Sequence, residues 1–130
     1  MTIYADASAL VKIVTEESGS SELRSFLDRR GAVATSIVGA IELRRAGRRI
    51  QSDVSAEVDT LLAAVIVLGL DEALASSAGR LGPPGLRTLD SIHLATAAIL
   101  AEDLEVLVTY DRRLAEAATA LGMPVVSPGA

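Results

Sequence analysis

Short runs of apolar residues alternate along this chain with longer stretches in which apolar residues recur every three or four positions. A short apolar run is typical of a buried β-strand, and the longer spacing is typical of a helix with one buried face. Leu10, Val11 and Val14 show the helical spacing clearly. The pattern predicts strands at residues 2–5, 32–35, 65–68, 106–109 and 124–126. It predicts helices at residues 7–16, 20–30, 55–64, 71–81, 86–100 and 111–121, and one more helix that begins at residue 37 and continues into the segment 44–49.

The order of these segments predicts the fold class. Strands that alternate with helices are typical of an α/β fold, here with a mainly parallel sheet of about five strands and helices on both faces, in three layers. The strongest loop signal is the Gly-Pro-Pro-Gly segment at residues 82–85. No repeat or linker divides the chain, so we expect one domain over residues 1–130.

Composition limits the chemistry that is available to this chain. There is no cysteine, which excludes disulfides and thiolate metal sites, and His93 is the only imidazole. No signal-peptide pattern opens the sequence, and its longest apolar run, residues 61–70, is too short to cross a bilayer. We therefore expect a soluble cytoplasmic protein without a membrane partner.

The charge distribution leaves a nucleic-acid partner open. A net charge of −5 argues against a general nucleic-acid binder, and with two tyrosines, one phenylalanine and no tryptophan a platform for stacked bases is not expected. However, residues 44–49 contain four arginines, among them Arg44 and Arg45. This cluster is equally consistent with contacts to RNA phosphates and with a solvated helix end that the helix dipole favours.

Four acids occupy comparable positions in the expected fold. Asp6 follows the first strand, Asp111 follows the fourth, Asp90 lies at the start of a buried helix, and Glu42 lies inside the helix after the second strand. Ligands of open α/β sheets bind outside the carboxyl ends of the strands. We therefore expect Asp6 and Asp111 at one end of the sheet, within reach of Glu42 and Asp90.

Each acid also has a purely structural interpretation. An aspartate at a helix start is a favoured cap worth about 1 kcal/mol. A glutamate in mid-helix cannot cap, but it can be solvated or form an ion pair with a nearby arginine. The possible caps are Asp6, Asp71, Asp90 and Asp111, and the possible partners of Glu42 are Arg45 and Arg49.

Convergence of the four carboxylates would have chemical consequences. Their mutual repulsion requires a counter-ion, and oxygen donors without thiolates suit Mg²⁺ or Mn²⁺, which activate water for phosphoryl chemistry. No serine, cysteine or lysine nucleophile with a paired base is apparent, so water is the expected nucleophile. Without metal, we expect the acids to raise one another's pKa values, and Asp6→Asn or Asp90→Asn to leave stability unchanged or higher.

Other polar residues lie beside these acids. His93 is one turn after Asp90, and because its helix neighbours are apolar we favour a buried, hydrogen-bonded histidine over a general base. Arg112 and Arg113 directly follow Asp111. Their position makes them candidates for contact with a substrate that carries phosphate groups.

Four motifs of the chain resemble the PIN-domain ribonucleases, and most closely the VapC-type toxins of bacterial toxin–antitoxin pairs. The resemblance covers essentially the whole chain, with the motifs in order, and the third is the most specific. The motifs are Asp6-Ala7-Ser8, Ile41-Glu42-Leu43, Leu89-Asp90-Ser91-Ile92-His93-Leu94-Ala95-Thr96-Ala97 and Thr109-Tyr110-Asp111-Arg112-Arg113-Leu114.

The resemblance implies an endoribonuclease that depends on Mg²⁺ or Mn²⁺ and hydrolyses RNA phosphodiester bonds. Asp6 and Asp90 would be the core metal ligands, Glu42 would bind the metal or its water, and Asp111 would complete the acidic pocket. Two further positions match residues that hydrogen-bond the acids in such sites. These positions are Ser8 and Thr109.

The resemblance also implies partners. It implies a homodimer, inhibited by a small VapB-type antitoxin that wraps the toxin and places a basic side chain in the pocket. The low aromatic content favours an RNA that is recognised by shape and backbone, such as tRNA or rRNA.

Three other classes of protein share parts of this pattern. A dehalogenase-type phosphatase needs a second acid two residues after Asp6, where this chain has Ser8. A response-regulator receiver needs a lysine after a late strand, and the only lysine is Lys12. The remaining alternative is a non-catalytic α/β module that binds a partner and whose acids are helix caps.

Overall fold

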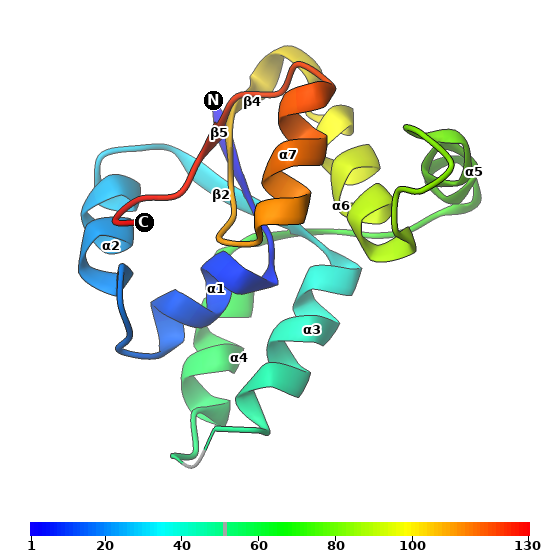
Figure 1. Ribbon diagram of the computed structural model, residues 1–130. Coiled ribbons are helices and arrows are strands. Elements are labelled where there is room, and N and C mark those ends of the chain that lie inside the picture. Colours follow the sequence, from blue (N-terminus) through cyan, green and yellow to red (C-terminus); the bar gives the residue numbers. More distant parts are fainter. Residues whose placement is uncertain (51) are drawn as a thin grey trace.

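One or two helices follow each of the first four strands in the computed structural model, which describes residues 1–50 and 52–130 (Figure 1). The strands are β1 (Thr2–Ala5), β2 (Ala32–Ser36), β3 (Ile66–Leu68), β4 (Leu104–Val108) and β5 (Val125–Val126). The helices are α1 (Ala7–Val14), α2 (Ser20–Asp28), α3 (Ile37–Gly47), α4 (Ser55–Ala64), α5 (Glu72–Arg80), α6 (Thr88–Ile99) and α7 (Arg112–Ala120), with a 3₁₀ turn η1 (Ala101–Asp103).

The strands form one five-stranded sheet in the order β3-β2-β1-β4-β5, and every neighbouring pair is parallel. The α/β class and the parallel sheet predicted from the sequence are confirmed. The central strand β1 lies between β2 and β4, where Tyr4 is opposite Ala34 on one side and Leu107 on the other. The residues that follow β1 and β4 therefore emerge side by side at the same end of the sheet.

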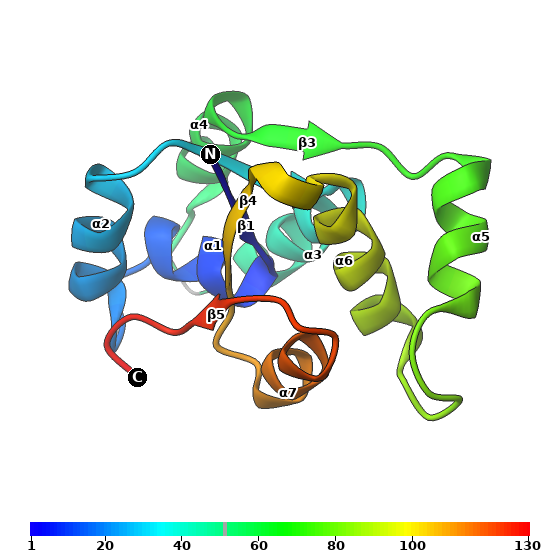
Figure 2. The same cartoon turned by 90° about the horizontal axis from the view of Figure 1, so that it is seen from above.

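Helices cover both faces of the sheet, and the side chains of β1 alternate between them. Ile3 and Ala5 belong to one core cluster with α1 to α4, whereas Tyr4 belongs to a second cluster with Leu94 of α6 and Leu114 of α7. Viewed from above, α2 lies on one side of the sheet and α5 lies on the other, outside α6 (Figure 2). The arrangement is the expected three-layer one.

Local sequence signals explain where the helices begin and end. The side chains of Asp6 and Ser36 accept hydrogen bonds from backbone N–H groups at the starts of α1 and α3. Gly122, with φ of 82°, follows the end of α7, as the sequence predicted. The first helix ends at Val14, two residues earlier than predicted, because the backbone of Thr15 is extended, while its N–H and its hydroxyl both donate to the Val11 carbonyl.

Helix α6 is the most deeply packed helix and carries the predicted site residue Asp90 and the histidine that was predicted to be buried. Asp90 and His93 are both among its buried residues, and the helix contacts β2, β4, α3, α5 and α7. The small side chains at Ala95 and Ala97 permit this close packing. No helix within residues 1–50 and 52–130 has the length and apolar character needed to cross a membrane.

Candidate functional site

A pocket of about 400 Å³ lies at the carboxyl end of β1 and between the first turns of α1, α6 and α7. All four acids predicted from the sequence line it, although they come from four different elements. The remaining lining residues include one arginine and the single histidine. The acids are Asp6, Glu42, Asp90 and Asp111, and the two basic residues are Arg87 and His93.

Asp6 is held at the bottom of this pocket by three hydrogen-bond donors. The Ser8 hydroxyl donates to Oδ1 at 2.7 Å, the Ala9 N–H donates to Oδ1 at 3.1 Å, and the Thr109 hydroxyl donates to Oδ2 at 2.7 Å. The side chain is almost fully buried. Asp6 therefore caps α1, in agreement with its structural interpretation, and at the same time lines the pocket.

Ser8 and Thr109 are themselves fixed by the segment that follows β4. The Tyr110 N–H donates to the Ser8 hydroxyl oxygen at 2.8 Å, and the Asp111 N–H donates to the Thr109 hydroxyl oxygen at 3.0 Å. Each hydroxyl thus accepts from this segment and donates to Asp6. The two residues support Asp6 in the way that the family resemblance implied.

Burial dominates the electrostatics of Asp6. Desolvation raises the pKa of its carboxyl above the ordinary value of 3.8, while the hydrogen bonds from Ser8 and Thr109 and the nearby imidazole of His93 act in the opposite direction. The raised pKa agrees with the direction expected from the sequence, but its main cause is different. The expected cause was repulsion between carboxylates, whereas the main cause here is the loss of water around one carboxylate.

Asp90 is not a helix cap, which corrects one structural interpretation. The N-cap residue of α6 is Arg87, and Asp90 is the third residue of the helix, buried in its first turn. Its Oδ2 atom accepts a hydrogen bond from Nε of Arg87 at 3.2 Å. The carboxylate is therefore free of a capping role and faces the pocket.

Asp111 combines a cap with a place in the pocket. Its Oδ1 atom accepts from the N–H groups of Arg113 and Leu114 at the start of α7, at 2.9 and 3.4 Å. Its Oδ2 atom lies 3.8 Å from Nη2 of Arg87. One carboxylate oxygen thus serves the fold while the other remains available to the site.

Glu42 has a partner that the sequence did not predict. Its Oε1 atom lies 2.7 Å from Nε2 of His93, and not beside Arg45 or Arg49. On the other side of the ring, Nδ1 of His93 lies 2.6 Å from the hydroxyl of Tyr4. A carboxylate can only accept, so Nε2 carries a proton. The prediction that His93 is buried and hydrogen-bonded is confirmed.

A close approach between α3 and α6 makes this contact possible. Gly39 lies one turn before Glu42, and a Cβ atom built on it would lie 2.4 Å from Oγ1 of Thr35 and 3.2 Å from Cε1 of His93. A side chain at this position would collide with the Thr35 hydroxyl and press on the edge of the imidazole, so glycine permits the close approach. Sequence reasoning missed Gly39, and its only signal was a glycine inside an otherwise strong helix.

Burial pushes the pKa of the Tyr4 hydroxyl far above its usual range. The hydroxyl therefore keeps its proton at all ordinary pH values and can donate to Nδ1 of a neutral His93. The chain of contacts from Tyr4 through His93 to Glu42 fixes the direction of the glutamate carboxylate. His93 acts here as a positioning residue.

The four carboxylates fit a hard metal ion in kind, because they supply only oxygen donors. Within residues 1–50 and 52–130, however, no three aspartate, glutamate or histidine side chains lie close enough together to hold one ion. Arg87 holds Asp90 and Asp111, and His93 holds Glu42. A metal ion would therefore require the acids to draw together, with a change in at least one of these contacts.

All four arginines that were predicted to bind RNA lie outside the pocket. Arg112 and Arg113 are exposed on α7, where only Asp111 and Leu114 face the pocket. On α3, Arg44 pairs with Asp59 at 2.8 Å, which suits its interpretation as a solvated helix end, and Arg45 is exposed. Arg87, which does line the pocket, was missed although it lies only three positions before Asp90.

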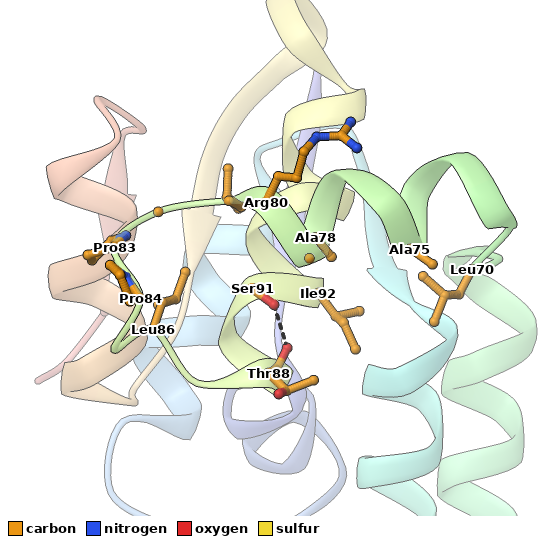
Figure 3. A pocket seen from close by; sticks show the side chains of 13 residues that line it. Leu70, Ala75, Ala78, Arg80, Pro83, Pro84, Leu86, Thr88, Ser91 and Ile92 are labelled. Atoms are coloured by element: carbon orange, nitrogen blue, oxygen red, sulfur yellow. Dashed lines mark hydrogen bonds between the residues drawn. The ribbon is translucent and has the colours of Figure 1, made fainter.

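A larger cavity of about 500 Å³ lies on the other side of the first turn of α6 (Figure 3). It is bounded by α5 and by Pro83, Pro84 and Leu86, and its lining contains no acid and no histidine. The Ser91 hydroxyl in its wall donates to the Thr88 carbonyl at 2.8 Å. The one charged lining residue in the described part of the chain is Arg80, so this cavity lacks the carboxylates and the imidazole that acid–base or metal chemistry needs.

Comparisons with known proteins agree with the geometry. The sequence model of the PIN domain family matches residues 3–120. Ribonuclease VapC35 of Mycobacterium tuberculosis is 41% identical over 131 residues, which cover 98% of this chain and 97% of the relative.

Two solved structures share the fold over nearly the full length. The crystal structure of VapC20 from Mycobacterium tuberculosis, a sarcin–ricin loop cleaving toxin, has a TM-score of 0.72 at 16% identity and covers 97% of this chain and 99% of that chain. A toxin–antitoxin complex from Klebsiella pneumoniae has a TM-score of 0.73 at 20% identity and covers 97% of both chains.

Proposed function

This chain belongs to the PIN-domain family, and we propose that it is a metal-dependent endoribonuclease, the toxin of a toxin–antitoxin pair. A sequence identity of 41% to a ribonuclease of the VapC group, over 98% of this chain, supports RNA cleavage. The single observation that carries the proposal is the gathering of four carboxylates in one pocket at the carboxyl ends of β1 and β4. Ligands of parallel α/β sheets bind at such ends.

The metal would be held by oxygen atoms of this pocket. We propose Asp6 and Asp90 as the core ligands, with Glu42 and Asp111 completing the site. An ionised carboxylate offers about four lone-pair positions, and the three hydrogen bonds to Asp6 leave about one of them, on Oδ2, for a ligand. A bound Mg²⁺ or Mn²⁺ supplies charge stabilisation at the phosphate and lowers the pKa of water.

The other residues of the pocket would position these acids. Ser8 and Thr109 favour the ionised form of Asp6 and fix its direction, because they donate to its carboxylate oxygens. His93 directs Glu42 through Nε2 and is in turn fixed by Tyr4. Partners of this kind typically change metal affinity or activity about 10- to 100-fold when they are removed.

The proposed substrate is a structured RNA such as tRNA or rRNA. Support comes from the aromatic residues, which serve the fold: Tyr4 is fully buried, Phe26 packs against the core and under Arg30, and the Tyr110 hydroxyl donates to the Pro128 carbonyl. Stacking along a single strand is therefore not available from these rings. Phosphate contacts from four exposed arginines remain part of the proposal. These are Arg44, Arg45, Arg112 and Arg113.

A VapB-type antitoxin is the proposed protein partner. A hollow of about 410 Å³ between α1 and α4 is lined mainly by apolar residues, including Ile13, Val14 and Leu61. An apolar segment of an antitoxin could bind there, as amphipathic helices bind in grooves. Leu23 of the neighbouring helix α2 is fully buried in the core and is not available to such a partner.

A homodimer is also part of the proposal. Ile37 and Ile41 lie one turn apart on α3 and expose 40% and 52% of their surface. We propose that these two isoleucines, on one face of the helix, contribute to the contact between the two copies. Light scattering of the free protein measures the oligomeric state, and Ile41→Glu should shift it to the monomer.

The experiment that tests the proposed function is RNA cleavage by the purified protein in Mg²⁺, in Mn²⁺ and in EDTA. We expect cleavage only with metal, and a loss of more than about 100-fold in Asp6→Asn and Asp90→Asn. Asp53→Asn is the matched control, because Asp53 is an exposed aspartate that bonds only to Ser55 in the described part of the chain. Cleavage that persists in EDTA or in both acid variants contradicts the proposal and favours a partner-binding module.

A further inference from the structure

Arg87 bridges two acids of the pocket that belong to different helices. Its Nε atom donates to Oδ2 of Asp90 at 3.2 Å, and its Nη2 atom lies 3.8 Å from Oδ2 of Asp111. The guanidinium therefore connects the first turn of α6 with the first turn of α7. Its side chain makes no cap for its own helix, although Arg87 is the N-cap residue of α6.

Exposure differs sharply between the partners. The side chain of Asp90 is 10% exposed and cannot leave the pocket, whereas the side chain of Arg87 is 51% exposed. Arg87 can therefore turn into solvent without disturbing the core. Apart from His93, which is held by Glu42, it is the only basic residue in the described lining. Arg87 is the counter-ion of this pocket in the structure.

A guanidinium and a metal ion compete for the same carboxylate oxygens. The oxygen atoms that face Arg87 belong to two of the four proposed metal ligands, so a metal ion that uses them displaces the arginine. A guanidinium binds phosphate with the same two-pronged geometry with which it binds carboxylate. The displaced arginine would then lie beside the place where the RNA phosphate is bound.

We propose that Arg87 exchanges partners during the working cycle: it holds Asp90 and Asp111 in the metal-free protein and binds an RNA phosphate once a metal ion has taken these acids. This inference rests on the proposed metal-dependent ribonuclease function. It assigns Arg87 two opposite effects. The residue weakens metal binding, because the metal must displace it, and strengthens RNA binding, because its positive charge becomes free.

Opposite effects distinguish this exchange from a structural role. Replacement of a residue that only supports the fold would weaken the binding of both metal and RNA. Arg87→Gln should instead bind Mn²⁺ about two- to fivefold more tightly and RNA about two- to fivefold more weakly, which is the range expected for one partly exposed charge contact. Arg87→Lys keeps the positive charge but loses the planar guanidinium with its paired N–H donors, so it should shift both affinities in the same directions by a smaller factor.

The measurement uses the full chain. Calorimetric titration with Mn²⁺ alone gives the metal affinity, and fluorescence anisotropy of a labelled RNA hairpin in Ca²⁺ gives the RNA affinity, with a gel to confirm that the RNA stays intact. Arg30→Gln is the matched control. It removes the same charge from an ion pair with Glu105, which lies at the start of β4, at the opposite end of the sheet.

The outcomes separate the exchange from the proposed function. The expected result is tighter Mn²⁺ binding and weaker RNA binding in Arg87→Gln than in Arg30→Gln. If Arg87→Gln binds Mn²⁺ like the unchanged protein, or RNA like the control, the exchange is wrong while the metal site stands. If neither the unchanged protein nor Arg87→Gln binds Mn²⁺, the metal site itself is wrong. If Arg87→Gln does not fold, the same two affinities are measured for Arg87→Lys, which should again bind Mn²⁺ more tightly and RNA more weakly than the unchanged protein.

Discussion

The Nε2 atom of His93 lies 2.7 Å from Oε1 of Glu42, and this contact joins α6 to α3 at the edge of the acid pocket. Because Tyr4 holds the other ring nitrogen at 2.6 Å, the imidazole has little freedom to turn. The direction of the Glu42 carboxylate is therefore set by a residue of the core. A mid-helix glutamate becomes part of the site through this contact.

We predict that His93→Ala lowers RNA cleavage about 10- to 100-fold and lowers the free energy of unfolding by about 2–4 kcal/mol. The change removes the partner of Glu42, leaves the buried Tyr4 hydroxyl without an acceptor and opens a cavity. Cleavage assays and urea unfolding measure the two effects.

Tyr4→Phe is the control for this prediction, because it removes only the contact at Nδ1. We expect a loss of about 1 kcal/mol in stability and activity within a few-fold of the unchanged protein. Equal loss of activity in Tyr4→Phe and His93→Ala would show that His93 acts through the core and not through Glu42.

Most of the fold was predictable from the sequence, because its signals are local. Apolar runs indicated all five strands, and the caps at Asp6 and Asp111 were visible as single residues. The order β3-β2-β1-β4-β5 was not predicted. It depends on the way the crossover helices pack against each other, which no short stretch of sequence determines.

The candidate site was predictable only as a set of acids. The carboxyl ends of parallel strands had to bring Asp6 and Asp111 together. The contact between Glu42 and His93 joins residues 51 positions apart and depends on the crossing of two helices at Gly39. Arg87 carried no signal in the sequence, because its contact with Asp111 forms only where the first turns of α6 and α7 lie side by side.

The crossing at Gly39 gives a second prediction. Gly39→Ala places a Cβ atom against Thr35 and His93, so we expect a loss of about 1–3 kcal/mol in stability and reduced cleavage. Gly79→Ala is the matched control, because a Cβ atom on this glycine of α5 meets nothing within 4 Å. The control should gain up to about 1 kcal/mol from helix propensity. Thermal unfolding measures both, and a neutral Gly39→Ala contradicts the prediction.

Two buried threonines give a third prediction, because the loss of one hydroxyl should be harmful and the loss of the other should not. Thr109→Val removes the donor to Oδ2 of Asp6 and the acceptor of the Asp111 N–H, so the pKa of Asp6 should rise further and cleavage at neutral pH should fall. Thr35→Val is the control. The Thr35 hydroxyl is buried without a hydrogen-bond partner among the described residues, so its loss should leave stability unchanged or raise it by about 1 kcal/mol. The pH dependence of cleavage and urea unfolding test the pair.

Asp6 gives the fourth prediction, the dependence of stability on pH in the metal-free protein. Burial raises the pKa of Asp6 in the folded state above the ordinary 3.8, so the folded state binds its proton more tightly than the unfolded state does. The stability that Asp6 contributes is therefore fully present below pH 3.8 and is lost as the pH rises through the raised pKa. At neutral pH the ionised form weakens the fold.

Asp6→Asn should remove the loss of stability that accompanies the ionisation of Asp6 as the pH rises. The amide oxygen can still accept from Ser8 and Ala9, and the amide nitrogen can donate to the Thr109 hydroxyl after that hydroxyl turns. At neutral pH in EDTA we expect the unfolding free energy to be unchanged or about 1 kcal/mol higher than in the unchanged protein. Below about pH 4 the two proteins should converge or the order should reverse, since Asp6 is then neutral as well.

In the same experiment, Asp53→Asn tests a contribution to the unfolding free energy that depends on pH in the opposite direction. Hydrogen bonds from Ser55 lower the pKa of Asp53, so its contribution to stability is present above the ordinary pKa of 3.8 and is lost as the pH falls through the lowered value. Urea unfolding between about pH 3 and pH 8 compares the three proteins. A clear loss of stability in Asp6→Asn at neutral pH would contradict the prediction. It would show that the negative charge of Asp6 stabilises the folded state and that the carboxylate has a structural role.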